Sequence, residues 1–227
     1  MTNGENQAAL AVRVWGNFAC FTRPEMKVER VTYPVPTPSA ARGILEAIFW
    51  KPEFTWRVEE IWVLNPIRYF SILRNEVTGR ASERAAVNWQ KNGGGYDASA
   101  SDNRSQRHTL ALRDVAYVIK AQVEVKPGVD ADVAKYRDQF RRRVQNGRCF
   151  ATPYLGCREF SAAFAPLAGT EKPINLTDNI GAMLYDLDYN PDGSGRGTPR
   201  FFDARVVDGI MRVPDLKQGG GHAVATA

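Results

Sequence analysis

The stretch 37–50, TPSAARGILEAIFW, gives the clearest structural signal in this chain of 227 residues. Thr37 is a good N-cap, and Pro38 suits the first helical position because its ring presets φ and leaves no N–H group unpaired. Pro52, just beyond the stretch, cannot continue a helix. Apolar side chains recur within it at helical spacing: Ala41, Ile44, Leu45 and Ile48. The stretch therefore predicts one amphipathic helix that covers an apolar surface.

Extended segments flank this helix and recur along the chain. Alternating apolar and polar side chains predict strands on either side of it, and others further on: 9–15, 54–64, 67–74, 106–113, 115–125 and 157–165. A second helix is predicted over 130–146, because acidic residues begin it, three arginines end it and Gly147 stops it. The order β-α-β, an antiparallel excursion, then β-α-β is typical of the ferredoxin-like (RRM-like) arrangement. We therefore predict an α+β fold.

The first predicted domain, a ferredoxin-like domain, spans residues 1–166. It carries an inserted β-hairpin or loop near 66–113. Within that insertion, residues 75–105 are polar and include three consecutive glycines, so they have little to bury. We expect a long mobile loop there, with one helical turn around 82–88.

A second, smaller region is predicted beyond Pro166. Strand-like runs at 181–189 and 200–206 flank NPDGSGRGTP, which is a strong hairpin signal, and a short strand is predicted at 209–213. These runs predict a small antiparallel β region over 167–216. Residues 217–227, which include three glycines in a row, are expected to form a disordered tail.

Composition limits the classes of function. The sequence is 44% hydrophobic and 24% charged, which excludes a wholly disordered chain. It has no run of 18 apolar residues that would predict a transmembrane helix. The start, MTNGENQAAL, lacks the basic and apolar regions of a signal peptide, and the three scattered cysteines suit a reducing compartment better than a disulfide framework. We therefore expect a cytoplasmic protein with no membrane partner.

The charge balance favours an anionic partner without requiring one. The net charge is +5, and arginine dominates the 30 basic residues. Arginine is the preferred side chain for bidentate phosphate contacts and for stacking on bases, although a GC-rich genome produces the same bias. No CxxC, HExxH or tight cluster of Cys, His and Asp is present, so no metal or cofactor is expected.

His108 is the candidate general acid or base. It lies where the glycine-containing loop enters a strand, with Arg104 and Arg107 close by in sequence. An imidazole between arginines can meet an anionic substrate and accept or donate a proton near neutral pH. The alternative is a surface histidine at the exposed start of a strand.

Other residues are candidates for nucleic-acid contacts. The run Arg141, Arg142 and Arg143 ends the second helix, where it is either a phosphate-binding patch or a solvated helix end that complements the helix dipole. Trp15 and Phe18 follow the first strand, and aromatic side chains on a ferredoxin-like sheet can stack on RNA bases. We expect at least two of Trp15, Phe18 and Phe21 to belong to the core instead.

Several long motifs carry a family resemblance. They are WGNFACF (15–21), YPVPTPSAARGILEAI (33–48), WKP (50–52), QRHTLALRDVAY (106–117) and YLGCREF (154–160). In this order they resemble the Cas-five family of CRISPR-associated proteins, RAMP superfamily, in its subtype I-C (Dvulg) form. The resemblance covers about residues 9–213. It implies that the ferredoxin-like domain binds RNA.

The resemblance also implies an activity and partners. Such a protein is a metal-independent endoribonuclease that cleaves precursor CRISPR RNA within each repeat. It then stays on the 5′ handle of the mature CRISPR RNA, as a subunit of an antiviral surveillance complex with Cas-seven backbone subunits and the Cas-eight large subunit. Target DNA is met only through that complex. The alternative is a handle-binding structural subunit without catalytic activity.

The resemblance places the family's catalytic residues on this chain. A Lys-His-type pair falls on Arg107 and His108, and a tyrosine late in the first helix falls on Phe49. Arginine keeps the positive charge but is a poor proton donor, and phenylalanine has no hydroxyl. Three explanations stay open: His108 and Arg107 suffice, another hydroxyl such as that of Tyr33 substitutes, or the alignment is shifted by one residue. Tyr33 and Lys51 are predicted as auxiliary residues.

Overall fold

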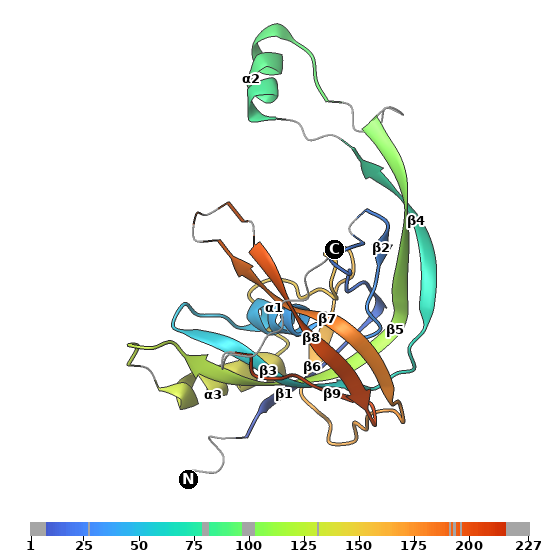
Figure 1. Cartoon of the computed structure of the whole chain (residues 1–227). Coiled ribbons are helices and arrows are strands. Elements are labelled where there is room, and N and C mark those ends of the chain that lie inside the picture. The colour runs from blue at the N-terminus through green and yellow to red at the C-terminus, as the bar shows by residue number, and fades with distance from the viewer. Residues whose placement is uncertain are drawn as a thin grey trace.

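The computed structural model describes residues 8–26, 28–78, 82–96, 103–130, 132–190, 192, 194–195 and 197–216. These residues form an α+β fold in which a large, mostly antiparallel sheet carries helices (Figure 1). The helices are α1 (Pro38–Ile48), α2 (Glu83–Asn92) and α3 (Val133–Gln145). The strands are β1 (Leu10–Ala19), β2 (Arg30–Val31), β3 (Phe54–Val63), β4 (Tyr69–Val77), β5 (Arg104–Val125), β6 (Ala163–Ala165), β7 (Asp178–Tyr189), β8 (Gly197–Val207) and β9 (Ile210–Arg212).

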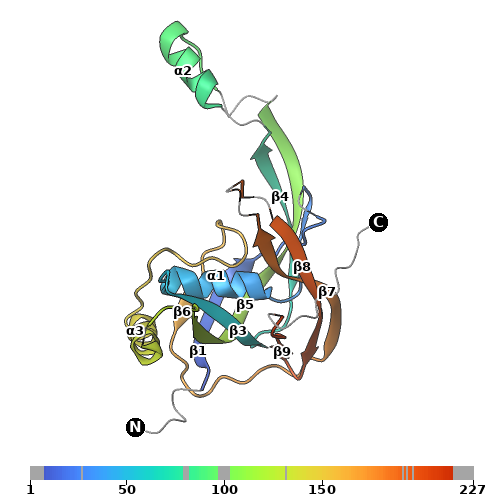
Figure 2. The ribbon, with the colours of Figure 1, turned by 60° about the vertical axis from the view of Figure 1, so that its left-hand side comes forward.

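The sheet is built around β5. The strand order is β6-β1-β5-β3-β9-β8-β7, and β2 and β4 also pair with β5. Every pairing is antiparallel except that of β2 with β5. Helices α1 and α3 contact each other and lie against the strands of this sheet (Figure 2). The strands of the predicted C-terminal region join the same sheet through β9, which pairs with β3. The division of the chain at residue 166 stays a prediction.

Helix α1 confirms the prediction from the stretch 37–50. The Thr37 hydroxyl oxygen accepts a hydrogen bond from the Ala40 N–H group at 3.1 Å, and Pro38 begins the helix. The four apolar residues of the predicted stripe are all buried. Beside this stripe, the Arg42 guanidinium forms an ion pair with Asp186 of β7 and so ties the helix to the C-terminal strands.

Strand β5 corrects one prediction. Residues 106–113 and 115–125 were expected as two strands, but they form a single strand of 22 residues. Asp114 has φ 55° and interrupts the ladder without ending it. Residues 117–125 of β5 pair with β3, and residues 104–112 pair with β4. Strand β4 and residues 104–112 of β5, with α2 at the far end, project from the rest of the molecule, and we call them the arm (Figure 2).

The tip of the arm corrects another prediction. A mobile loop with one helical turn was expected over 75–105, but residues 83–92 form helix α2. The Ser82 hydroxyl caps it by accepting from the Ala85 N–H group at 3.1 Å. Gly93, with φ 74°, ends it in a conformation that only glycine adopts readily. The parts of the expected loop at 79–81 and 97–102 lie outside the described residues.

The C-terminal half of the chain confirms some predicted strands and corrects another. The hairpin of β7 and β8 is confirmed, as is the short strand β9. The strand predicted at 157–165 is shorter, because only Ala163–Ala165 pairs with β1. Residues 150–162 form a loop, of which Cys157 and Phe160 pack with Ala111 and Phe70 at the end of the arm nearest the rest of the molecule, here called the arm's root. The tail at 217–227 lies outside the described residues. No helix in the described part of the chain is long and apolar enough to span a membrane.

Candidate functional site

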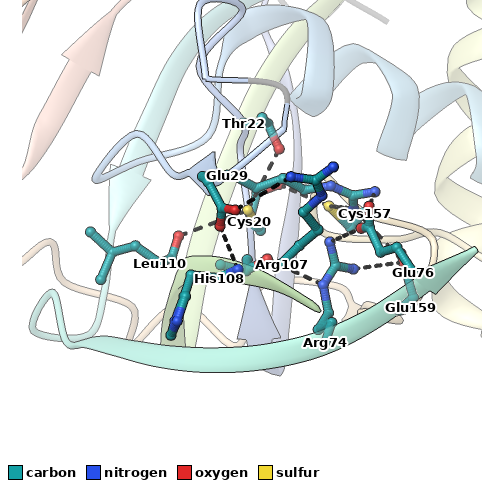
Figure 3. A network of polar contacts seen from close by, with 12 residues as sticks. Cys20, Thr22, Glu29, Arg74, Glu76, Arg107, His108, Leu110, Cys157 and Glu159 are labelled. Carbon is teal, nitrogen blue, oxygen red and sulfur yellow. Dashed lines mark hydrogen bonds and ion pairs between the residues drawn. The ribbon is translucent and has the colours of Figure 1, made fainter. Parts of the chain in front are cut away.

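The arm separates the two residues of the predicted catalytic pair. His108 lies opposite Leu73 and Arg107 lies opposite Arg74 in the antiparallel register of β4 and β5. Successive side chains of a strand point to opposite faces, and directly opposed residues share a face. Arg107 and His108 therefore lie on different faces of the arm. In Figure 3 Arg107 points towards a group of charged side chains, and His108 points away from it.

The outer face of the arm is the one that carries His108. It consists of alternate residues of the two strands: Tyr69, Ser71, Leu73, Asn75 and Val77 from β4, and Arg104, Gln106, His108 and Leu110 from β5. His108 is exposed, and so are its apolar neighbours Leu73 and Leu110. An exposed imidazole can accept a proton from a ligand that lies across this face. Arg104 lies at the start of β5 on the same face.

The inner face carries ion pairs. The Arg74 guanidinium contacts Glu76 at 2.8 Å and Glu159 at 3.0 Å, and its Nε donates to the Thr109 hydroxyl at 3.1 Å. Arg30 of β2 contacts the same two carboxylates at 3.3 and 3.8 Å. We call Arg30, Arg74, Glu76 and Glu159 the inner network. Because two cations face two carboxylates, this part of the arm offers no excess charge to a phosphate.

Arg107 is also engaged on the inner face. Its guanidinium lies 3.8 Å from the Glu29 carboxylate, which accepts a hydrogen bond from the His108 backbone N–H group (Figure 3). Glu29 immediately precedes β2, which pairs with Thr109 and Leu110 of β5. At His108, the next residue along this edge of β5, the Glu29 carboxylate accepts the backbone hydrogen bond that a neighbouring strand would otherwise accept. Glu29 thus links the guanidinium of one member of the predicted pair to the backbone of the other.

Tyr33 does not share a face with His108. Its side chain is buried, and its hydroxyl oxygen accepts from the Leu184 N–H group at 3.2 Å and lies 3.5 Å from the Ala182 carbonyl oxygen. Burial raises the pKa of this tyrosine, and the Arg23 guanidinium lies 4.4 Å from its ring centre. The hydroxyl therefore bonds to β7 rather than to the outer face of the arm.

Phe49 lies at the other end of β5 from His108. Its ring is buried and lies 5.5 Å from that of Phe54, which pairs with Val125. A strand rises roughly 3.3 Å per residue, so the part of β5 between His108 and Val125 has a contour of about 55 Å. Phe49 therefore packs near the end of β5 that lies away from the arm, and it does not line the outer face that carries His108.

The three arginines at the end of α3 do not act alike. Arg141 forms an ion pair with Asp138 at 3.0 Å. Arg143 is half-buried, donates to the Ile48 carbonyl oxygen at 3.1 Å and lies over the Phe49 ring. Arg142 is exposed and, with Arg143 and Arg148, lines a cavity of about 390 Å³. Part of the run therefore supports the fold, and part of it faces solvent.

Exposed aromatic side chains lie at the same end of the molecule. Trp50 is 49% exposed and Phe150 is 78% exposed. The Phe150 N–H group donates to the Ala47 carbonyl oxygen at 2.8 Å, which holds this residue beside the end of α1. Lys51 is exposed as well. We call Trp50, Lys51, Arg142, Arg148 and Phe150 the helix-end patch. Sequence reasoning missed Trp50, Arg148 and Phe150, because nothing in their spacing distinguishes them from core or loop residues.

The aromatic residues after β1 correct one expectation. At least two of Trp15, Phe18 and Phe21 were expected in the core, but only Phe21 is buried. Phe18 is 43% exposed and stacks on Phe70 of β4 with a distance of 4.8 Å between ring centres. Trp15 is half-buried beneath the Arg13 guanidinium. Trp15 and Phe18 line one cavity of about 380 Å³ beside the arm's root.

Comparisons with known proteins place the chain among CRISPR-associated proteins. A family model for the Cas5d form, described as "CRISPR-associated protein (Cas_Cas5)", matches residues 9–214. A protein of Thermus thermophilus, named CRISPR pre-crRNA endoribonuclease Cas5d, is 45% identical over 225 residues, which cover 92% of this chain and 93% of the relative. A protein of the same name from Mannheimia succiniciproducens is 43% identical over 217 residues, covering 90% of this chain and 94% of the relative.

A solved structure shares the fold. The crystal structure titled as that of a CRISPR-associated protein superposes with a TM-score of 0.66 at 23% identity and covers 92% of this chain and 93% of its own. At that identity the likeness concerns the fold alone. It supports the α+β architecture described above.

Proposed function

This chain belongs to the Cas5 family of CRISPR-associated proteins, and we propose that it is an endoribonuclease that cleaves precursor CRISPR RNA within its repeats. The observation that carries the proposal is the identity of 45% and 43%, over at least nine-tenths of both chains, with two proteins named for that activity. The exposed position of His108 supports it, because cleavage of RNA needs a base that the substrate can reach.

The proposed reaction uses the RNA as its own nucleophile and needs no metal ion. His108 takes the proton of the 2′-hydroxyl, and the 2′-oxygen attacks the adjacent phosphorus atom. The bond from phosphorus to the 5′-oxygen breaks, and the departing oxygen takes a proton from water. The products are a 2′,3′-cyclic phosphate and a 5′-hydroxyl end. An imidazole suits the first step because it exchanges protons near neutral pH.

The two faces of the arm assign different tasks to the predicted pair. His108 contacts the scissile nucleotide from the outer face, and Arg104 on the same face supplies positive charge to the RNA. Arg107 is a positioning residue, because its guanidinium faces Glu29 and Glu29 holds the His108 backbone. Tyr33 and Lys51 remain in the proposal as auxiliary residues, Tyr33 through its bond to β7 and Lys51 through RNA binding.

The remaining contacts serve to hold the product. The protein stays on the 5′ handle of the mature CRISPR RNA, within a surveillance complex with Cas-seven backbone subunits and the Cas-eight large subunit. The helix-end patch and the pair Trp15 and Phe18 are proposed RNA contacts, because both combine exposed or half-exposed aromatic rings with nearby arginines. Such a role places the protein in the cytoplasm, where the transcript is processed.

We also propose that residues 1–166 have a ferredoxin-like topology. Strands β6, β1, β5 and β3 are the fourth, first, third and second strands of a β-α-β-β-α-β unit whose helices are α1 and α3. This order supports a ferredoxin-like, RRM-like domain over 1–166, in which the arm is the insertion near 66–113. Residues 167–216 then form the small antiparallel region.

The test is cleavage of repeat RNA by the purified chain in EDTA. We expect one cut per repeat and a 2′,3′-cyclic phosphate end. His108→Ala should lose cleavage and keep binding, and Gln106→Ala, which changes the same face of the same strand, should cleave like the parent. A parent chain that binds repeat RNA but never cuts it would contradict the proposal and make the protein a structural handle-binding subunit.

A further inference from the structure

Two thiols meet at the root of the arm. Cys20 directly follows β1, and Cys157 lies in the 150–162 loop, yet the two cysteines belong to one buried cluster. Both are buried, with 0% and 8% of their surfaces exposed, and they pack with Ala111 of β5. Figure 3 shows the two sulfur atoms at the edge of the charged side chains of the arm's inner face.

The backbone holds this contact in place. The Cys20 N–H group donates to the Leu155 carbonyl oxygen at 3.0 Å, and Cys157 Sγ lies 3.5 Å from the Cys20 carbonyl oxygen. Gly156 lies between Leu155 and Cys157 in the chain and has φ 85°. A Cβ atom at this position would collide with the Cys20 carbonyl group. Only glycine lets the loop approach this closely. The two cysteines therefore stay together while the fold is intact.

The surroundings make one of the two thiols more acidic. The neighbouring Cys20 thiol lowers the pKa of the Cys157 thiol to about 6, against the effect of burial, and the Arg30 guanidinium, 3.3 Å away, lowers it further. Glu159 acts in the opposite sense. The neighbouring Cys157 thiol and burial raise the pKa of Cys20. Cys157 is therefore the more acidic thiol of the pair and the one that more readily forms a thiolate.

We propose that Cys157 and Cys20 are an oxidation site at which a hydroperoxide forms a reversible disulfide. The Cys157 thiolate attacks one oxygen of hydrogen peroxide, the O–O bond breaks and hydroxide leaves, so that the sulfur becomes a sulfenic acid. The Cys20 sulfur then attacks the Cys157 sulfur and forms the S–S bond. The sulfenic oxygen leaves as water with the Cys20 proton. Peroxide is reduced, the two thiols are oxidised, and a small thiol reverses the change.

The site connects to the arm through charge. Oxidation removes the anionic sulfur that faces Arg30, and Arg30 shares Glu76 and Glu159 with Arg74 of β4. The inner network then loses a negative neighbour, and its two guanidiniums face the two carboxylates alone. The proposal is independent of the RNA-cleaving activity, since it concerns the state of two thiols.

The test is peptide mapping of the full chain after mild treatment with hydrogen peroxide. Remaining thiols are alkylated under denaturing conditions, and the digest is analysed by mass spectrometry. We expect a linked pair of peptides that contain Cys20 and Cys157, lost after reduction, while the exposed Cys149 is recovered alkylated. Cys149→Ser should leave the link unchanged, and Cys157→Ser should abolish it. Oxidation of Cys149 with no link between Cys20 and Cys157 would overturn the proposal.

A second measurement does not depend on how the cysteine variants fold. In the parent chain, the rate of link formation should fall as the pH drops below about 6, where the Cys157 thiolate is protonated. Arg30→Gln removes the facing cation and should slow the link severalfold at pH 7, while Arg205→Gln, at an exposed ion pair elsewhere, should not. A rate that is the same at pH 5 and pH 7 would overturn the proposal.

Discussion

The two faces of the arm differ in what their side chains are free to do. On the outer face His108 is exposed beside Leu73 and Leu110, and its imidazole can meet a ligand. On the inner face Arg74 and Arg107 are held by carboxylates. Residues that are adjacent in the sequence thus have different surroundings, because a strand turns successive side chains to opposite faces. We propose that chemistry takes place on the outer face and that the inner face supports it.

The largest expected effect is the loss of the outer imidazole. His108→Ala should lower the rate constant of repeat cleavage about 10²–10⁴-fold, because a general base contributes about that factor. Affinity for repeat RNA should stay within about threefold of the parent, since phosphate contacts elsewhere supply most of the binding. Single-turnover cleavage and filter binding measure the two quantities. Parent-like cleavage would remove His108 from the mechanism and break the comparison.

A smaller effect is expected from the other member of the pair. Arg107→Ala should slow cleavage about tenfold or less, because its guanidinium acts through Glu29 and not on the phosphate. Arg107→Lys keeps the charge facing Glu29 and should recover most of the rate. The same single-turnover assay applies. A loss as large as that of His108→Ala, with no recovery by lysine, would show that both faces act directly on the RNA.

The inner network should matter for stability. Arg74→Ala removes two ion pairs and the hydrogen bond to the Thr109 hydroxyl. The Glu76 and Glu159 carboxylates then share the Arg30 guanidinium instead of two guanidiniums. We expect a loss of about 1–2 kcal/mol in the free energy of unfolding. Urea denaturation measures it. Arg205→Ala, which breaks an exposed pair with Asp203, should change stability by about 0.5 kcal/mol or less. Equal effects would mean that the network does not stabilise the arm.

The smallest effect concerns the helix-end patch, far along β5 from His108. Replacing Arg142 and Arg148 together by alanine should reduce affinity for repeat RNA severalfold. The slope of log affinity against log salt concentration should become less negative by roughly 0.7 per lost contact. Arg141→Ala is the control, because Arg141 already faces Asp138. Binding measured from low to moderate salt gives the slope. An unchanged slope would leave the patch without a role in RNA binding.

Local signals predicted much of the fold. Thr37, Pro38 and the apolar stripe were enough for α1, and the glycine-rich turn was enough for the hairpin of β7 and β8. The length of β5 was not predictable in this way, because Asp114 resembles a turn residue and only the flanking strands keep the ladder continuous. Only one turn of helix α2 was predicted, around 82–88, because the polar composition around it indicated a loop.

The candidate site was predictable only in part. The motif pointed to Arg107 and His108, and strand alternation could have placed them on opposite faces. Their shared partner Glu29 could not be found, since it precedes His108 by 79 residues. The contact between Cys20 and Cys157 was equally hidden, because 137 residues separate the two cysteines. Exposed aromatics such as Trp50 and Phe150 were missed for a related reason, because aromatic residues usually belong to a core. Contacts between distant segments depend on the whole sheet.

Chemical rescue tests the central claim most directly. Single-turnover cleavage of repeat RNA by His108→Ala is measured with and without added imidazole. Because His108 is exposed on the outer face, free imidazole can enter the space left by its side chain. We expect imidazole to raise the cleavage rate of His108→Ala and to leave that of Arg107→Ala unchanged. Failure of imidazole to restore any cleavage to His108→Ala, or equal rescue of both variants, would contradict the claim that the outer-face imidazole is the base.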